Sequence, residues 1–215
     1  MPDPDSPLHD DVVREMRSGD QEALASVFTV FRDRLKQIVS FRLDRRLAGR
    51  VSESDVLQEA YIAAVKRLHH FGESEEMSPF LWLRLITNQQ LVDLHRKHFQ
   101  AQQRDVRNEV SLQQRSLSAQ TSIAIAANLA CSMTAVSEYV VCAEQIDRLE
   151  TALNKMDAVD REVIALRHFE ELSNVETATV LGIETSAASK RYLRAMKRLS
   201  MIVSDFAKDD ENKQL

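Results

Sequence analysis

The chain has 215 residues, of which 44% are hydrophobic, and its formal net charge is -5. Only four glycines and four prolines interrupt it, which indicates a globular protein rich in helix. The acidic balance excludes general affinity for nucleic acid, so any contact with DNA must come from a local basic patch. The acidic, proline-containing start is unlike a secretory leader, and we expect a cytoplasmic protein.

Residues 10–100 contain four segments whose apolar residues recur at helical spacing. The longest apolar stripe covers 24–38 and needs partner helices to cover it. Ser52 and Asp55 resemble a capping box at the start of the third segment. Pro79 can open the fourth, because its missing N–H costs nothing in a first turn. We therefore predict a four-helix amino-terminal domain over 10–100.

Residues 101–143 are predicted to link this domain to a second one. No charged residue occurs from Ser116 to Ser137, a length that raises the question of a membrane span. Nine of these residues are Ser, Thr, Asn or Gln, so transfer into lipid is unfavourable and we expect no membrane segment. The composition favours a flexible linker, and docking along a partner's groove is the alternative.

A second helical domain is predicted over 144–204, followed by a frayed, charged tail over 205–215. Near its end two helices meet at Gly182, because glycine takes the positive φ that is common after a helix. Thr185 or Ser186 could cap the second of these helices. The pattern is typical of a helix–turn–helix.

The second helix of this pair is strongly basic. From Thr185 to Val203 it has no acidic residue and five cations: Lys190, Arg191, Arg194, Lys197 and Arg198. A helix–turn–helix of this kind places its second helix in the major groove, where cations neutralise phosphates and other side chains reach base edges. A helical hairpin with a solvated basic face is the alternative.

The order of these motifs resembles the extracytoplasmic-function (ECF) group of bacterial sigma factors. The matching stretches are DVLQEAYIAAVKRLHHF and PFLWLRLITNQQLVDLHRK in the first domain, then DREVIALRHFEELS ahead of the basic helix–turn–helix. The resemblance implies an all-α fold of two small domains joined by a flexible linker. It implies a sigma factor that binds core RNA polymerase at its clamp and flap surfaces and directs initiation at promoter DNA. It implies no catalytic residue and no cofactor, and an anti-sigma factor is a possible partner.

The resemblance also assigns roles to individual residues. The helix that meets the polymerase clamp carries Asp55, Gln58 and Glu59. Opening of the minus-ten element is assigned to Phe71, Arg84, Asn88, Arg96 and Lys97, whereas Trp82 is taken as core. Recognition of the minus-thirty-five element is assigned to Ser189, Lys190, Arg191, Leu193, Arg194 and Arg198. Arg194 is the candidate for base readout, because arginine to guanine is the commonest specific pairing, and Arg191 and Arg198 are assigned to phosphates.

Two other functions remain open from the residues alone. A free-standing helix–turn–helix regulator would have no use for the polar set on the third helix. A protein-interaction module without DNA contact is suggested by the acidic loop over 72–77. No metal site is expected, because no thiol or carboxylate set completes a tetrahedral site with the four candidate histidines, His69, His70, His95 and His98.

Overall fold

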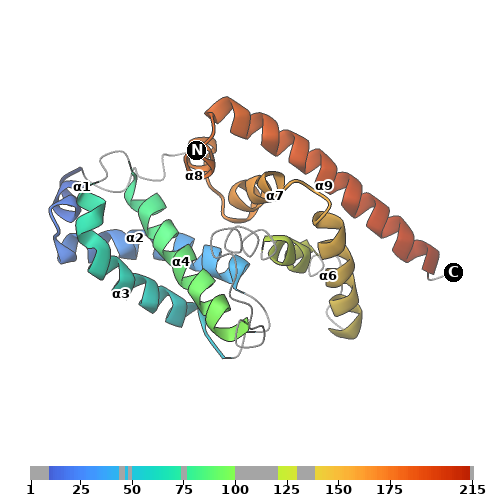
Figure 1. Cartoon of the computed structure of the whole chain (residues 1–215), viewed down its shortest axis with the longest axis horizontal. Coiled ribbons are helices and arrows are strands. Elements are labelled where there is room, and N and C mark those ends of the chain that lie inside the picture. The colour runs from blue at the N-terminus through green and yellow to red at the C-terminus, as the bar shows by residue number, and fades with distance from the viewer. Residues whose placement is uncertain are drawn as a thin grey trace, which may run out of the picture. The chain divides into compact units, whose positions relative to one another are not determined.

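The computed structural model describes residues 10–43, 47, 50–73, 77–99, 121–129 and 139–213 (Figure 1). The regular elements among these residues are helices, and none is a strand. Two compact units divide the chain, Met1–Asp105 and Val106–Leu215. The predicted all-α class is therefore confirmed. Among the described helices, none is long and apolar enough to cross a membrane.

The described part of the first unit forms four helices, as the sequence predicted. They are α1 (Asp10–Arg17), α2 (Gln21–Arg42), α3 (Glu53–Gly72) and α4 (Pro79–Phe99). The three long helices α2, α3 and α4 pack pairwise against one another, and α1 packs on α2 and α3. This arrangement covers the apolar stripe of α2 from several sides.

The core of the first unit is built on that stripe. Five of its residues are at most 1% exposed: Leu24, Val27, Phe31, Leu35 and Ile38. Each large apolar side chain buried in this way contributes about 1.5–3 kcal/mol. Trp82 is also in the core, as predicted, with its ring centroid 5.1 Å from that of Phe71.

Gly72 allows the end of α3 to lie against α1. A Cβ at this position would overlap the backbone carbonyl oxygen of Arg17, so a side chain there would force the two helices apart. The guanidinium of Arg17 lies 4.6 Å from the centroid of the Phe71 ring and donates to the carbonyl oxygen of Met77 at 3.0 Å. These contacts fix the end of α3 beside α1.

The start of α3 is a capping box, as the sequence predicted. The backbone N–H of Asp55 donates to Ser52 Oγ at 3.1 Å, and the backbone N–H of Ser52 donates to Asp55 Oδ2 at 2.9 Å. The Ser52 hydroxyl also donates to Oδ2, at 2.8 Å. These bonds favour the carboxylate, with the backbone bond contributing most, and they lower the pKa of Asp55 below its ordinary 3.8.

In the second unit, a long carboxy-terminal helix packs against three shorter ones. From residue 139 onward the elements are α6 (Tyr139–Leu153), α7 (Ala158–Ile164), the π-helix η2 (Ala165–Phe169), α8 (Asn174–Leu181) and α9 (Thr185–Lys213). Helix α9 packs on α6, α7 and α8, and α7 continues directly into η2. The predicted helix–turn–helix is formed by α8 and α9.

Two predicted segments differ from the structure. Residues 121–129 are helical, so the prediction of a flexible linker is wrong there. The Thr121 hydroxyl donates to Glu162 Oε2 at 2.8 Å, and Ile125 is fully buried, which adds tertiary contacts to a stretch rich in alanine. The rest of the predicted linker, 101–120 and 130–138, lies outside the described residues.

The second difference is at the carboxy terminus. Helix α9 continues to Lys213, past the predicted domain end at 204, because no glycine or proline follows Gly182 to stop it. The prediction of a frayed tail is therefore wrong for the backbone up to Lys213. The last two residues lie outside the described part of the chain.

Replacing Asp55 with alanine should lower the melting temperature at neutral pH and have no effect in strong acid. The capping carboxylate has a depressed pKa, so its stabilisation is present above the ordinary aspartate value and is lost as the pH falls through the folded-state pKa. The difference in Tm between wild type and Asp55→Ala, followed by circular dichroism, should therefore be constant from about pH 7 to about pH 5 and vanish near about pH 2. Asp33→Ala, an exposed aspartate inside α2, is the control and should show no such pH dependence. An Asp55→Ala difference that persists unchanged in acid would contradict this role.

Candidate nucleic-acid interface

Helix α8 has a defined start and a defined end. At its start the backbone N–H of Ser173 donates to Glu176 Oε2 at 2.6 Å, and the N–H of Glu176 donates to Ser173 Oγ at 3.2 Å. At its end Gly182 has φ 62°, and its N–H donates to the carbonyl oxygens of Ala178 and Thr179. The predicted left-handed turn at Gly182 is confirmed. The Ser173–Glu176 capping box was missed, although its S-x-x-E signature is present in the sequence.

The turn leads directly into α9. The carbonyl oxygen of Glu184 accepts the first helical hydrogen bond, from the N–H of Ala188 at 2.9 Å. Glu184 therefore occupies the N-cap position, and the prediction that Thr185 or Ser186 caps the helix is wrong. The carbonyl oxygen of Thr185 instead accepts a bond from Asn174 Nδ2 at 2.8 Å, which ties the start of α9 to α8.

One face of α9 is buried against its neighbours. Ala188 and Ala195 are fully buried and Leu199 is 5% exposed. These positions are seven and four residues apart, so they lie on one side of the helix. Thr177 of α8 is also fully buried, and the small side chains at 177 and 188 let α8 and α9 approach closely.

The opposite face of α9 points to solvent. We define this outer face by four exposed residues, Lys190, Leu193, Arg194 and Lys197. Leu193 is 67% exposed, a high value for a leucine that lies among three cations. Ser189, also predicted to contact DNA, is exposed beside this face. Lys197 was not among the residues assigned to the minus-thirty-five element, although its spacing of three residues from Arg194 places it on the same face.

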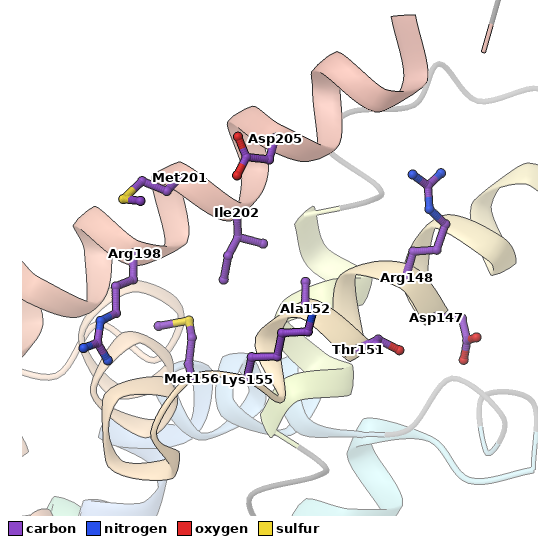
Figure 2. A pocket seen from close by; sticks show the side chains of 10 residues that line it. All are labelled: Asp147, Arg148, Thr151, Ala152, Lys155, Met156, Arg198, Met201, Ile202 and Asp205. Carbon is purple, nitrogen blue, oxygen red and sulfur yellow. The ribbon is translucent and has the colours of Figure 1, made fainter. Parts of the chain in front are cut away.

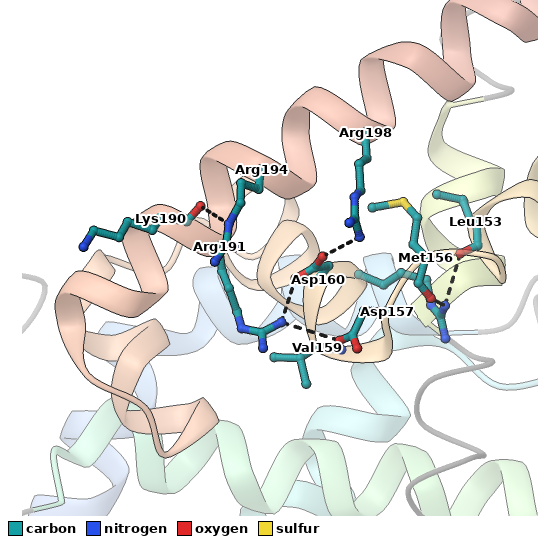
Figure 3. A network of polar contacts seen from close by, with 10 residues as sticks. Leu153, Met156, Asp157, Val159, Asp160, Lys190, Arg191, Arg194 and Arg198 are labelled. Atoms are coloured by element: carbon teal, nitrogen blue, oxygen red, sulfur yellow. Dashed lines mark hydrogen bonds and ion pairs between the residues drawn. The ribbon is translucent and has the colours of Figure 1, made fainter.

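The other two arginines of α9 lie on its flank and contact α7 (Figure 3). Arg191 Nη1 is 2.8 Å from Asp160 Oδ1 and 3.6 Å from Asp157 Oδ1. Arg198 Nη1 is 3.2 Å from Asp160 Oδ2. The Asp160 side chain is only 10% exposed, whereas that of Arg198 is 60% exposed. Asp160 was not among the residues predicted from the sequence, because its partners are 31 and 38 residues away along the chain.

A groove of about 760 Å³ lies between α6 and the later part of α9 (Figure 2). Its apolar lining comes from Ala152, Met156, Met201 and Ile202. Charged residues also line it: Asp147, Arg148, Lys155, Arg198 and Asp205. Met201 is 58% exposed, so the groove presents apolar surface to solvent. Such a surface suits another protein better than a phosphate backbone.

The three residues predicted to bind polymerase lie on the surface of α3. Asp55, Gln58 and Glu59 are exposed. The Asp55 carboxylate already accepts hydrogen bonds in the capping box, so it holds the helix start in addition to any contact with a partner. Gln58 and Glu59 take no part in this capping box.

The residues predicted to open the minus-ten element are divided between core and surface. Phe71 is fully buried and Arg84 is 5% exposed, because α4 is buried on nearly all sides near its start. The assignment of these two side chains to DNA does not agree with their burial, and we assign both to packing. Arg96 and Lys97 are exposed, and Arg96 Nη2 is 3.2 Å from Asp93 Oδ1.

Asn88 is half-buried in the middle of α4. Its Oδ1 atom is covered and has no hydrogen-bond partner among the described residues. A covered amide oxygen without a partner is unfavourable for folding, which makes this residue a candidate for function. Residues 74–76, which are half of the predicted acidic loop over 72–77, lie outside the described part of the chain.

Comparisons with known proteins agree with this arrangement. The family model described as ECF sigma factor matches residues 10–203. The ECF RNA polymerase sigma factor SigW of Bacillus subtilis (strain 168) is 23% identical over 194 residues, which are 90% of this chain and 95% of that protein. The RNA polymerase sigma factor NccH of Alcaligenes xylosoxydans xylosoxydans is 26% identical over 153 residues, 69% of this chain and 72% of that protein.

A solved structure, that of CnrH in complex with the cytosolic domain of CnrY, matches with a TM-score of 0.49 and 21% identity. The match covers 94% of this chain and 99% of that one. The family model spans most of the chain and includes both the four-helix unit and the helix–turn–helix. The chain therefore belongs to the ECF sigma factor family.

Proposed function

We propose that this sigma factor binds core RNA polymerase and directs initiation at promoters whose minus-thirty-five element it reads with α9. The observation that supports this most strongly is the outer face of α9. This face carries three exposed cations and an exposed leucine, and it follows a tight turn that ties α9 to α8. A helix of this diameter fits the major groove, where each base pair presents a distinct pattern of donors and acceptors.

Within that face Arg194 is the proposed base reader. It lies between Lys190 and Lys197 on the outer face. Phosphate contacts made by these two lysines would place the Arg194 side chain in the major groove. A guanidinium can donate two bonds to guanine O6 and N7. Leu193 and Ser189 supply an apolar group and a hydroxyl beside it, which suit a thymine methyl and a base edge.

The first unit is proposed to open the minus-ten element with α4. Arg96 and Lys97 near its end can hold phosphates, and Asn88 offers an amide that could read the edge of an unstacked base. The covered Oδ1 of Asn88 supports this assignment, because the described residues around it provide no partner for that atom.

Contact with core polymerase is proposed at two places. Gln58 and Glu59 on α3 offer acceptors to basic groups on the clamp. In the second unit, the groove between α6 and α9 is the candidate for the flap, because its partly apolar lining suits a protein (Figure 2). An anti-sigma factor would be expected to compete for these same surfaces.

Changing Gln58 and Glu59 together to alanine should weaken binding to core polymerase by about tenfold, because about 1–2 kcal/mol of polar contact is lost. The dissociation constant can be measured with labelled protein and purified core enzyme. Asp33→Ala removes an exposed carboxylate from α2 in the same unit and is the matched control. Asp55 is left intact, because its loss would disturb the start of α3. Unchanged affinity of the double variant would rule out this surface.

Arg194→Ala should relax specificity at one base pair of the minus-thirty-five element, with a loss of about 1–3 kcal/mol of discrimination there. The holoenzyme can be tested on a set of promoters in which each base pair is changed in turn. Lys197→Ala, on the same face, should instead weaken all promoters equally. A uniform loss for Arg194→Ala would reassign Arg194 to a phosphate.

Asn88→Leu should leave the first unit as stable as wild type or more so, because it removes an unsatisfied oxygen and a poor helix former, and it should impair promoter opening. Stability can be followed by thermal melting, and opening by permanganate reactivity of thymines in the minus-ten element. Gln90→Leu changes another half-buried amide of α4 and should leave opening unchanged. Normal opening by Asn88→Leu would remove Asn88 from the site.

A further inference from the structure

The five cations of α9 between Thr185 and Val203 form two groups with different surroundings. Lys190, Arg194 and Lys197 lie on the outer face and are exposed. Arg191 and Arg198 lie on the flank next to α7, and their guanidinium groups extend toward Asp160 (Figure 3). The spacing of seven residues between these two arginines is two helical turns, which puts them on the same side of α9.

Asp160 holds the two flank arginines at once. Its Oδ1 accepts from Arg191 at 2.8 Å and its Oδ2 accepts from Arg198 at 3.2 Å. The carboxylate lies in the first turn of α7, whose start is fixed by a bond from the N–H of Val159 to Asp157 Oδ1 at 2.8 Å. Because the carboxylate is nearly buried and its helix is anchored, it cannot move outward with the arginines.

The charges of the four paired residues in this cluster cancel, and Arg194, which borders the same pocket, donates from its Nε to the backbone carbonyl oxygen of Lys190 at 3.3 Å. Arg191 and Arg198 contribute two positive charges, and Asp157 and Asp160 contribute two negative ones. A phosphate that approached the flank would have to compete with a carboxylate already in place. Drawing the arginines away would leave Asp160 nearly buried without its partners, which is strongly unfavourable.

We propose that Asp160 determines specificity by withholding Arg191 and Arg198 from DNA phosphates, which leaves Lys190, Arg194 and Lys197 as the DNA-facing cations. The pairing reduces affinity for DNA of any sequence and increases the share of binding that comes from base contacts. The inference rests on the proposed function, in which α9 lies in the major groove. It also replaces the assignment of Arg191 and Arg198 to phosphates with a structural role between α7 and α9.

The test measures binding of the full chain to two duplexes, one with the promoter elements and one of unrelated sequence, over a series of salt concentrations. Asp160→Asn should bind the unrelated duplex about tenfold more tightly at about 0.1 M salt. The slope of log K against log salt should become steeper by about 0.9 for each arginine released. The ratio of the affinity for the promoter duplex to that for the unrelated duplex should fall. Asp33→Asn makes the same change in net charge at an exposed position on α2, outside the proposed binding surfaces, and should have little effect.

Two glutamine variants provide a second measurement in the wild-type background. Lys197→Gln should make the salt slope shallower by about 0.9, whereas Arg198→Gln should leave it nearly unchanged. In the Asp160→Asn background, Arg198→Gln should reverse part of the gain in affinity. If Asp160→Asn fails to fold by circular dichroism, the comparison of Lys197→Gln with Arg198→Gln decides the question.

Two results would overturn the inference while leaving the proposed function intact. One is weaker or unchanged DNA binding by a folded Asp160→Asn chain. The other is a loss of slope in Arg198→Gln as large as that in Lys197→Gln, which would make Arg198 a phosphate contact. Absence of salt-dependent DNA binding by the wild-type chain, both alone and with core polymerase, would instead overturn the proposed function and the inference together.

Discussion

The direction in which α9 faces depends on the burial of Ala188, Ala195 and Leu199 on one side of it. Residues of a helix keep fixed positions around its axis. Burial of this side therefore determines the direction in which the opposite side faces. Alanine at two of the three contact positions keeps α9 close to its neighbours and leaves little room for rotation. This packing already limits the orientation of α9. The hydrogen bond from Asn174 to the start of α9 and the contact of Asp160 with its flank add to that restriction.

Local sequence signals predicted most of the elements correctly. The apolar stripe of α2, the Ser52–Asp55 capping box and the glycine turn at 182 each involve residues close together in the chain, and each was confirmed. The helix at 121–129 was missed because the segment is uncharged and lies in a stretch rich in alanine, serine and threonine, a composition that is equally typical of a linker. Its tertiary bond to Glu162 comes from a segment far along the chain, which no local pattern reveals.

The candidate site was predicted less completely than the fold, for a related physical reason. A motif places a residue on a helix, but packing decides which residues of that helix remain accessible. Phe71 and Arg84 lie in helices that the motifs predicted correctly, yet both are buried. The basic character of α9 was evident in the sequence, whereas the division of its cations depends on Asp160, a residue of another helix. Charge counted along the sequence therefore does not show which cations of α9 are paired within the protein.

This division is consistent with a protein that meets DNA as part of a larger assembly. Once a helix–turn–helix is attached to an enzyme already near the promoter, its effective concentration at the site is high, and a modest intrinsic affinity is sufficient. Additional phosphate contacts would then add little in the assembly, but they would strengthen binding of the free chain to any DNA. Under the proposal, pairing the two flank arginines with Asp160 avoids that competition, and the exposed Arg194 would be left to distinguish one base pair from another. In a chain of net charge -5, the acidic balance acts in the same direction, because it disfavours binding of DNA outside local basic patches.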